Sequence, residues 1–199
     1  MKHIQQGIDG EMEDAEKLSL HVALNPRIQQ YLYQSYNYSN TYQYGLMEII
    51  KDFGTYYISN NFINDFFIYL KNSDIVLTPR GKYDLDGFYK SIYQNEEYAF
   101  DDWYSLITSR NEKKYHPVGE ITINGEKHNS IAYLQSIPVA DSGVPLASVI
   151  VLIDERKIQD IVKNIKWIDQ VELFIVDENN KLISTAQKDH TMVPLNLEK

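Results

Sequence analysis

The sequence predicts an α+β fold in which a long N-terminal helix packs on a module with a central antiparallel sheet of five strands. Three observations lead to this prediction: an apolar stripe with helical spacing at the start of the chain, short apolar runs separated by turn residues in its middle, and a strand–turn–strand pattern that occurs twice. The expected order is a long helix, two strands, small helices, three strands and a final helix.

The start of the chain predicts the long helix. Its apolar residues follow one another at intervals of three and four, at Ile4, Ile8, Met12, Ala15, Leu18 and Val22. This stripe is longer than one small module needs, so it also predicts a homodimer through the N-terminal helix. Because the helical pattern is already present in the first residues, with no capping signal before it, we expect membrane spans outside this sequence.

Two further helices complete a first, stalk-like region of residues 1–60. Pro26 interrupts the first helix and can begin a short second one, which we expect to end at Tyr33. Residues 35–44 are polar and aromatic, which is typical of a loop, and helical spacing returns over about residues 41–60. The first third of the chain is therefore expected to be helical.

The middle of the chain predicts the sheet. Two apolar runs, residues 65–71 and 74–78, are joined by a polar turn and indicate a β-hairpin. Helical spacing then predicts two small helices, at residues 85–93 and 101–110. Further apolar runs predict three more strands, which are expected at residues 117–123, 129–139 and 146–154 and precede a helix at 155–165.

The strand–turn–strand pattern occurs again near the end of the chain. Residues 65–78 and 172–185 match without a gap, each with an apolar strand, a polar turn, a second apolar strand and a hydroxyl residue. Any two β-hairpins share part of this pattern, but the match can also mark a repeated unit. On that second interpretation, residues 61–166 form one module, and residues 167–199 begin a second, smaller module that is truncated.

Composition excludes several kinds of function. The net charge of −9 makes nucleic acid an unfavourable partner for this segment, because its phosphates would be repelled. Without cysteine, thiol nucleophiles and Cys-type zinc sites are impossible, and the five histidines are scattered, so we expect no metal site. Nucleophile and phosphate-binding motifs are missing, so we expect neither an enzyme nor a cofactor.

Three places in the chain resemble one known family. They are the repeated strand–turn–strand unit, the helix start Asp101-Asp102-Trp103-Tyr104, and the strand of residues 149–154 that ends in Asp154 before a helix. In these places the chain resembles the double Cache (PAS-like) sensor domains of bacterial transmembrane receptors, above all those of Gram-positive histidine kinases and AraC-type regulators. The resemblance implies an extracellular signal-transduction domain, anchored in the cell membrane, that binds a small molecule.

The resemblance also implies a ligand pocket between the sheet and the helices of residues 84–110. Trp103 and Tyr104 would cover the ligand, although both can instead pack the helix against the sheet. Asp154 would accept hydrogen bonds from an amine or from sugar hydroxyls, or it would cap the helix that follows. Tyr133 and Gln135 alternate with small and apolar neighbours on a strand and are further candidate ligand contacts.

The chain departs from the family in one respect. The branch of the family that binds amino acids has an arginine close to the Trp-Tyr pair, whereas residues 96–102 contain no basic residue. We therefore expect a neutral or cationic ligand, such as a sugar or an amine. The alternative function is a module that binds no small ligand and only dimerises or contacts another exported protein. A deep pocket would favour the sensor, and side chains that fill the same space would favour the alternative.

Overall fold

The computed structural model describes residues 2–33, 40–57, 63–95, 98–111, 114–123, 125–139, 143–163, 173–176 and 182–186. Its helices are α1 (Lys2–Ala23), α2 (Pro26–Tyr33), α3 (Asn40–Tyr57), α4 (Leu85–Ser91), α5 (Phe100–Thr108) and α6 (Glu155–Lys163). Its strands are β1 (Ile63–Leu70), β2 (Ile75–Thr78), β3 (Gly81–Asp84), β4 (Tyr93–Asn95), β5 (Lys114–Ile123), β6 (Glu126–Ile137), β7 (Ala147–Asp154), β8 (Leu173–Val176) and β9 (Leu182–Ala186).

Seven of these strands form one curled antiparallel sheet in the order β3-β2-β1-β7-β6-β5-β4. All five strands that the sequence predicts are present, and the fold class is confirmed. The short strands β3 and β4 extend the sheet by one strand at each edge. The sequence analysis missed them because a strand of three or four residues with exposed positions has no apolar run to mark it.

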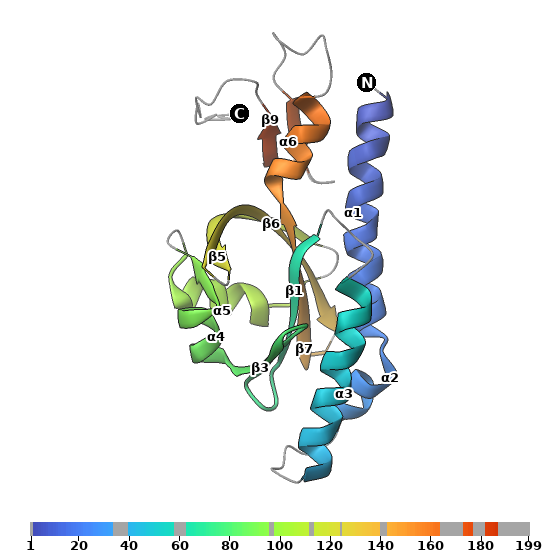
Figure 1. Ribbon diagram of the computed structural model, residues 1–199, viewed down its shortest axis with the longest axis vertical. Helices are drawn as coiled ribbons and strands as arrows, with labels where there is room; N and C mark the ends of the chain where they lie inside the picture. The colour runs from blue at the N-terminus through green and yellow to red at the C-terminus, as the bar shows by residue number, and fades with distance from the viewer. Residues whose placement is uncertain are drawn as a thin grey trace.

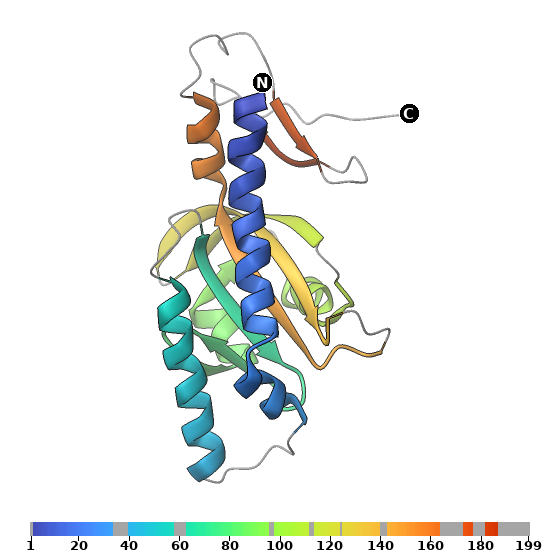
Figure 2. The same cartoon turned by 90° about the vertical axis from the view of Figure 1, so that its right-hand side faces the viewer.

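Helix α1 lies along one face of the sheet, and α4 and α5 lie on the other (Figures 1 and 2). The predicted apolar stripe faces the sheet: Ala15 and Val22 are completely buried, and Met12 and Leu18 are nearly so. The Tyr115 hydroxyl, on β5, donates to the backbone oxygen of Met12 at 3.1 Å. The described part of the stripe therefore packs against the sheet of the same chain. The homodimer through this helix remains a prediction; along the described part of the stripe it would need another face of the helix.

Helix α3 packs on the same face of the sheet as α1. Its Phe53 ring meets Phe66 of β1 edge to face, with centroids 5.2 Å apart. Helix α3 begins at Asn40, next to the predicted helix start at about residue 41; residues 41–44, where the predicted loop and the predicted helix overlap, are helical. The helical spacing of apolar residues in α3 starts only at Tyr42 and Leu46. The polar residues at the start of the helix therefore also fit the pattern of a loop. Residues 35–39 of the predicted loop lie outside the described residues.

The hairpin predicted from the repeated pattern is present. Strands β8 and β9 pair antiparallel in a two-stranded sheet of their own. Helix α6 is linked to this hairpin, because the Ser184 hydroxyl on β9 donates to the Glu155 carboxylate at the start of α6. Burial raises the pKa of Glu155. The hairpin, α6 and the N-terminal end of α1 lie at the same end of the molecule (Figure 1). The division into modules at residues 61–166 and 167–199 remains a prediction.

Asp154 joins β7 to α6. Its carboxylate accepts the backbone N–H of Arg156 at 3.0 Å, and it also accepts two hydrogen bonds from the Arg156 guanidinium, Nε to Oδ1 at 3.0 Å and Nη2 to Oδ2 at 2.7 Å. Burial acts to raise the pKa of Asp154, but the hydrogen bonds and charge of Arg156 outweigh it, and the pKa is lowered. Asp154 therefore holds the start of α6 on the end of β7.

We expect Phe53→Ala to lower the free energy of unfolding by about 3–5 kcal/mol, because it leaves a cavity between α3 and the sheet. Urea denaturation followed by circular dichroism measures this change. Met47→Ala is the matched control on the same helix, since Met47 is 60% exposed, and its effect should stay within about 0.5 kcal/mol. Equal effects of the two substitutions would contradict the packing of α3 on the sheet.

We expect Asp154→Ala to lower the free energy of unfolding by about 1–2 kcal/mol at pH 7, because α6 loses its cap. A lowered carboxyl pKa contributes stability above the unfolded value of about 3.9, and this contribution is lost as the pH falls through the folded value. The difference between wild type and variant should thus shrink below about pH 4. Denaturation at pH 7 and pH 3 measures it, with the exposed Asp9→Ala as control. A difference that is independent of pH would refute the charged cap.

Candidate ligand-binding site

The face of the sheet covered by α4 and α5 carries a cluster of aromatic side chains. Phe67 of β1, Phe88 of α4 and Trp103 of α5 contact one another, with ring centroids 4.8 Å apart for Phe67 and Phe88, 6.3 Å for Phe88 and Trp103, and 6.4 Å for Phe67 and Trp103. Tyr93 of β4 completes the group, 5.4 Å from Trp103. These four residues are all buried. The space that the family resemblance assigns to a ligand is therefore largely filled by the protein's own side chains.

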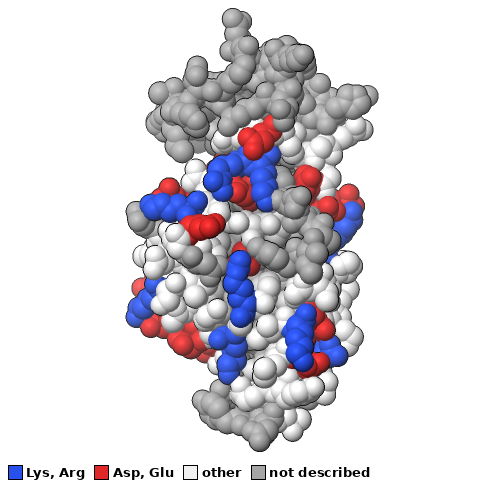
Figure 3. Space-filling model, viewed as in Figure 1, with Lys and Arg blue, Asp and Glu red and all other residues white. Residues whose placement is uncertain are grey.

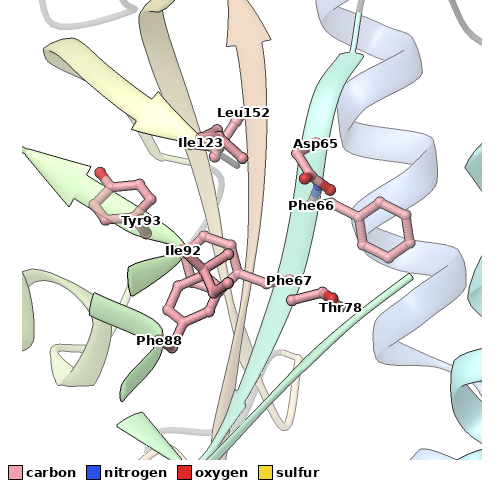
Figure 4. A pocket seen from close by; sticks show the side chains of 9 residues that line it. All are labelled: Asp65, Phe66, Phe67, Thr78, Phe88, Ile92, Tyr93, Ile123 and Leu152. Atoms are coloured by element: carbon pink, nitrogen blue, oxygen red, sulfur yellow. The ribbon is translucent and has the colours of Figure 1, made fainter. Parts of the chain in front are cut away.

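A small cavity remains beside this cluster (Figure 4). Its volume is about 10 Å³, which is close to the minimum for one water molecule. It is lined by Asp65, Phe66, Phe67, Thr78, Phe88, Ile92, Tyr93, Ile123 and Leu152. In Figure 4 the rings of Phe67 and Phe88 lie together on the cavity side of β1, while the Phe66 ring points to the other side, towards the helices. A sugar or an amine would fit here only after the cluster moves.

Asp65 is the one acidic group in this lining. It lies within β1, its side chain is 9% exposed, and it forms an ion pair with the Arg80 guanidinium. The Phe66 backbone N–H donates to its carboxylate at 2.8 Å. Burial raises the pKa of Asp65 in spite of the nearby charge of Arg80. The sequence signal was available: Asp65 is an acidic residue directly before a run of five apolar ones, and we did not weigh it as a ligand contact.

Arg80 is positioned by the turn between β2 and β3. Its backbone N–H donates to the Thr78 hydroxyl at 3.0 Å, and the backbone N–H of Gly81 donates to the same oxygen at 3.1 Å. This turn brings the guanidinium to the edge of β1, next to Asp65. The site thus holds one anion and one cation that neutralise each other, and a charged ligand group would have to exchange with one of them.

The structure keeps Trp103 and Tyr104 together on α5 but gives them different surroundings. Trp103 is buried within the aromatic cluster, as the packing alternative predicts. Tyr104 is 36% exposed and stacks on Phe100 at a centroid distance of 5.9 Å. On its other side it meets Tyr69 of β1 edge to face at 6.3 Å. Tyr104 is therefore at the rim of the cluster, where it can contact solvent.

The other three predicted contacts lie away from this cluster. Tyr133 is on the opposite face of the sheet, where it packs against Tyr115 at 4.8 Å in the apolar cluster under α1. Gln135 follows it by two residues on β6 and is buried, with its amide donating to the Ser136 oxygen at 3.2 Å. Asp154 is engaged by Arg156, as the cap of α6. The structure therefore does not bring these three to Trp103 and Tyr104.

Other kinds of site find no support within the described parts of the chain. No group of three or more His, Asp or Glu side chains described by the structure could hold a metal ion. In the described ranges, no helix has the length and apolarity needed to span a membrane. On the face shown in Figure 3, basic and acidic side chains are interspersed and separated by wide uncharged areas. This face offers no extended basic surface to a polyanion.

Comparison with known proteins supports the fold. No protein-family model matches the chain, and no curated protein matches it. The sensory domain of the Campylobacter jejuni chemoreceptor Tlp3 (CcmL) with isoleucine bound is similar in structure, with a TM-score of 0.51 at 14% identity over 92% of this chain and 64% of that one. The ligand-binding domain of Tlp3 in complex with 4-methylisoleucine gives a TM-score of 0.52 at 16% identity, over 92% of this chain and 63% of that one.

The complex of the same Tlp3 domain with L-valine gives a TM-score of 0.51 at 14% identity, over 92% of this chain and 64% of that one. This chain thus spans less than two thirds of each of these domains. At such low identity the likeness concerns the fold. It confirms an α+β architecture of the Cache and PAS-like kind, with a long N-terminal helix and a curled antiparallel sheet.

Proposed function

We propose that this chain is the extracellular ligand-sensing domain of a bacterial transmembrane receptor. The observation that carries the proposal is the combination of a sensor-type fold with a buried acid, Asp65, beside an aromatic cluster on the α4–α5 face. A buried ionisable group next to a cavity is costly for folding, so it often marks a functional position. The output domain would be a histidine kinase or an AraC-type regulator, as the family resemblance implies.

The proposed ligand is a small neutral or cationic molecule, and an amine fits the side chains best. Asp65 would bind its ammonium group, after exchange with Arg80. The aromatic faces of Phe88 and Tyr93, which line the same cavity, would attract the same charge through cation–π interaction. The Tlp3 domains bind amino acids in their structures, and among the described residues beside this cavity Arg80 is the cation with which a carboxylate could pair. Amino acids therefore belong in any screen as a comparison.

Signalling in this proposal depends on expansion of the cavity. A cavity of about 10 Å³ must grow for a ligand to enter, which would displace α5 or the edge of the sheet. Leu152, which lines the cavity, lies on β7, and β7 leads into α6. Because α6 and the N-terminal end of α1 lie at the same end of the molecule, a shift of one against the other could move attached membrane spans.

The second candidate function is a module that contacts another exported protein, or a second copy of itself, without a small ligand. One observation favours it: the aromatic side chains of Phe67, Phe88, Tyr93 and Trp103 already fill the expected pocket. A packed cluster of this kind is also an ordinary way to attach two helices to a sheet. The two functions differ in one measurable property, which is whether a small molecule stabilises the folded chain.

We expect a thermal-shift screen to separate the two candidates. The probes are putrescine, phenylethylamine, neutral monosaccharides and branched-chain amino acids. A ligand at about 100 times its dissociation constant adds about 2.7 kcal/mol, which raises the melting temperature by about 5–10 °C in a chain of this size. An amine should give this shift. If no probe raises the melting temperature, the interaction module becomes the better explanation.

Asp65→Asn should abolish the shift caused by an amine, because it removes the negative charge and keeps the side-chain volume. Asp86→Asn is the matched control, since Asp86 is an exposed carboxylate on α4 that pairs with the solvent-exposed Lys90. The control should keep the full shift. An amine that stabilises Asp65→Asn as well as wild type would remove Asp65 from the site.

A further inference from the structure

A groove between α2 and α3 lies at the end of the molecule opposite the N-terminal end of α1 (Figure 1). Its volume is about 320 Å³, within the range of small-molecule sites. Its lining consists of Arg27, Gln30, Tyr31, Thr41, Tyr44, Gly45 and Glu48. The size of the groove therefore points to a small molecule.

The floor of the groove is an aromatic ring held against a helix backbone. A Cβ atom at Gly45 would lie 2.7 Å from Cε2 of Tyr31, so only glycine lets the Tyr31 ring lie directly on α3. Tyr42 packs on this ring with centroids 4.5 Å apart, and burial raises the pKa of Tyr31 to about 12. Tyr44 contrasts with Tyr31, because it is 63% exposed. The Tyr44 ring is therefore accessible to a ligand, next to the buried Tyr31 ring that forms the floor of the groove.

The charges at the groove are balanced. Arg27 pairs with Asp52 at 2.5 Å, and Glu48 pairs with Lys51 at 2.5 Å. A strongly anionic or strongly cationic ligand would therefore gain little electrostatic binding energy in the groove. What remains is a set of planar hydrogen-bonding groups, the Arg27 guanidinium and the Gln30 amide, next to aromatic rings. These groups match a neutral ring that carries many hydroxyls.

We propose that the α2–α3 groove binds a neutral saccharide. One sugar ring lies against Tyr44, and its hydroxyls exchange hydrogen bonds with Gln30 and Arg27. The exposed ring of Tyr44 agrees with recognition, because tyrosine is enriched in binding surfaces. This site goes beyond the proposed sensing of an amine: it lies on the α1 side of the sheet, whereas Asp65 and Trp103 belong to the cavity and cluster of the α4–α5 side.

Isothermal titration calorimetry with glucose, N-acetylglucosamine, cellobiose and chitobiose tests the proposal. At least one of these sugars should bind saturably to the whole chain. Tyr44→Ala should weaken that binding by about tenfold or more, and Tyr44→Phe, which keeps the ring, should change it by less than about threefold. Tyr33→Ala is the matched control: Tyr33 is 68% exposed on α2 and does not line the groove, so binding should be unchanged. Thermal unfolding of each variant verifies that it is folded.

Four results would overturn the proposal. They are no saturable binding of any of the four sugars, full binding by Tyr44→Ala, an equal loss in Tyr33→Ala, and binding of a protein partner through Tyr44 in place of a sugar. Asp65→Asn distinguishes this site from the sheet site. Sugar binding that survives in Asp65→Asn but fails in Tyr44→Ala supports the groove whether or not an amine binds, and the reverse pattern would place the sugar in the cavity and refute the groove.

Discussion

The structure depends on covering both faces of the central strands. All eight residues of β7 are buried, and so are the last eight of β6. A strand that is buried on both sides needs an apolar layer above it and another below it, and each large apolar side chain in such a layer contributes about 1.5–3 kcal/mol. The layer on one face comes from α1, α2 and α3, and the layer on the other comes from α4 and α5. Burial of these strands on both faces therefore requires helices on both sides of the sheet.

The sequence predicted most of this architecture, for identifiable reasons. The five predicted strands carry apolar residues in short runs or in alternation, and α1 has a stripe of clear periodicity, so both are visible in a single sequence. The edge strands β3 and β4 were missed because hydrogen bonding to a neighbour, and not apolar content, defines them. Pairing with a neighbouring strand leaves little trace in the local sequence pattern.

The candidate site was harder to predict than the fold. Period-two alternation places Tyr133 and Gln135 on one face of β6, but it does not say which helices cover that face. Asp154 lies at a strand end and also at a helix start, so the sequence allowed either a ligand contact or a helix cap. Only its hydrogen bonds with Arg156 show that it caps the helix. Asp65 was not predicted because it lies inside a strand, whereas the predicted acid, Asp154, ends one. Its pKa is raised and that of Asp154 is lowered, so the two acids differ in how far their partners offset burial.

Strand β7 ends at Asp154, and α6 begins at Glu155, with no residue between them. A flexible loop at this place would absorb small displacements by changes in its own dihedral angles. Here the carboxylate of Asp154 binds both the backbone and the guanidinium of Arg156, so the joint is also braced from the side. Such a joint has little mechanical compliance. A tilt of β7 would therefore be passed on to α6, with the angle between the two elements unchanged.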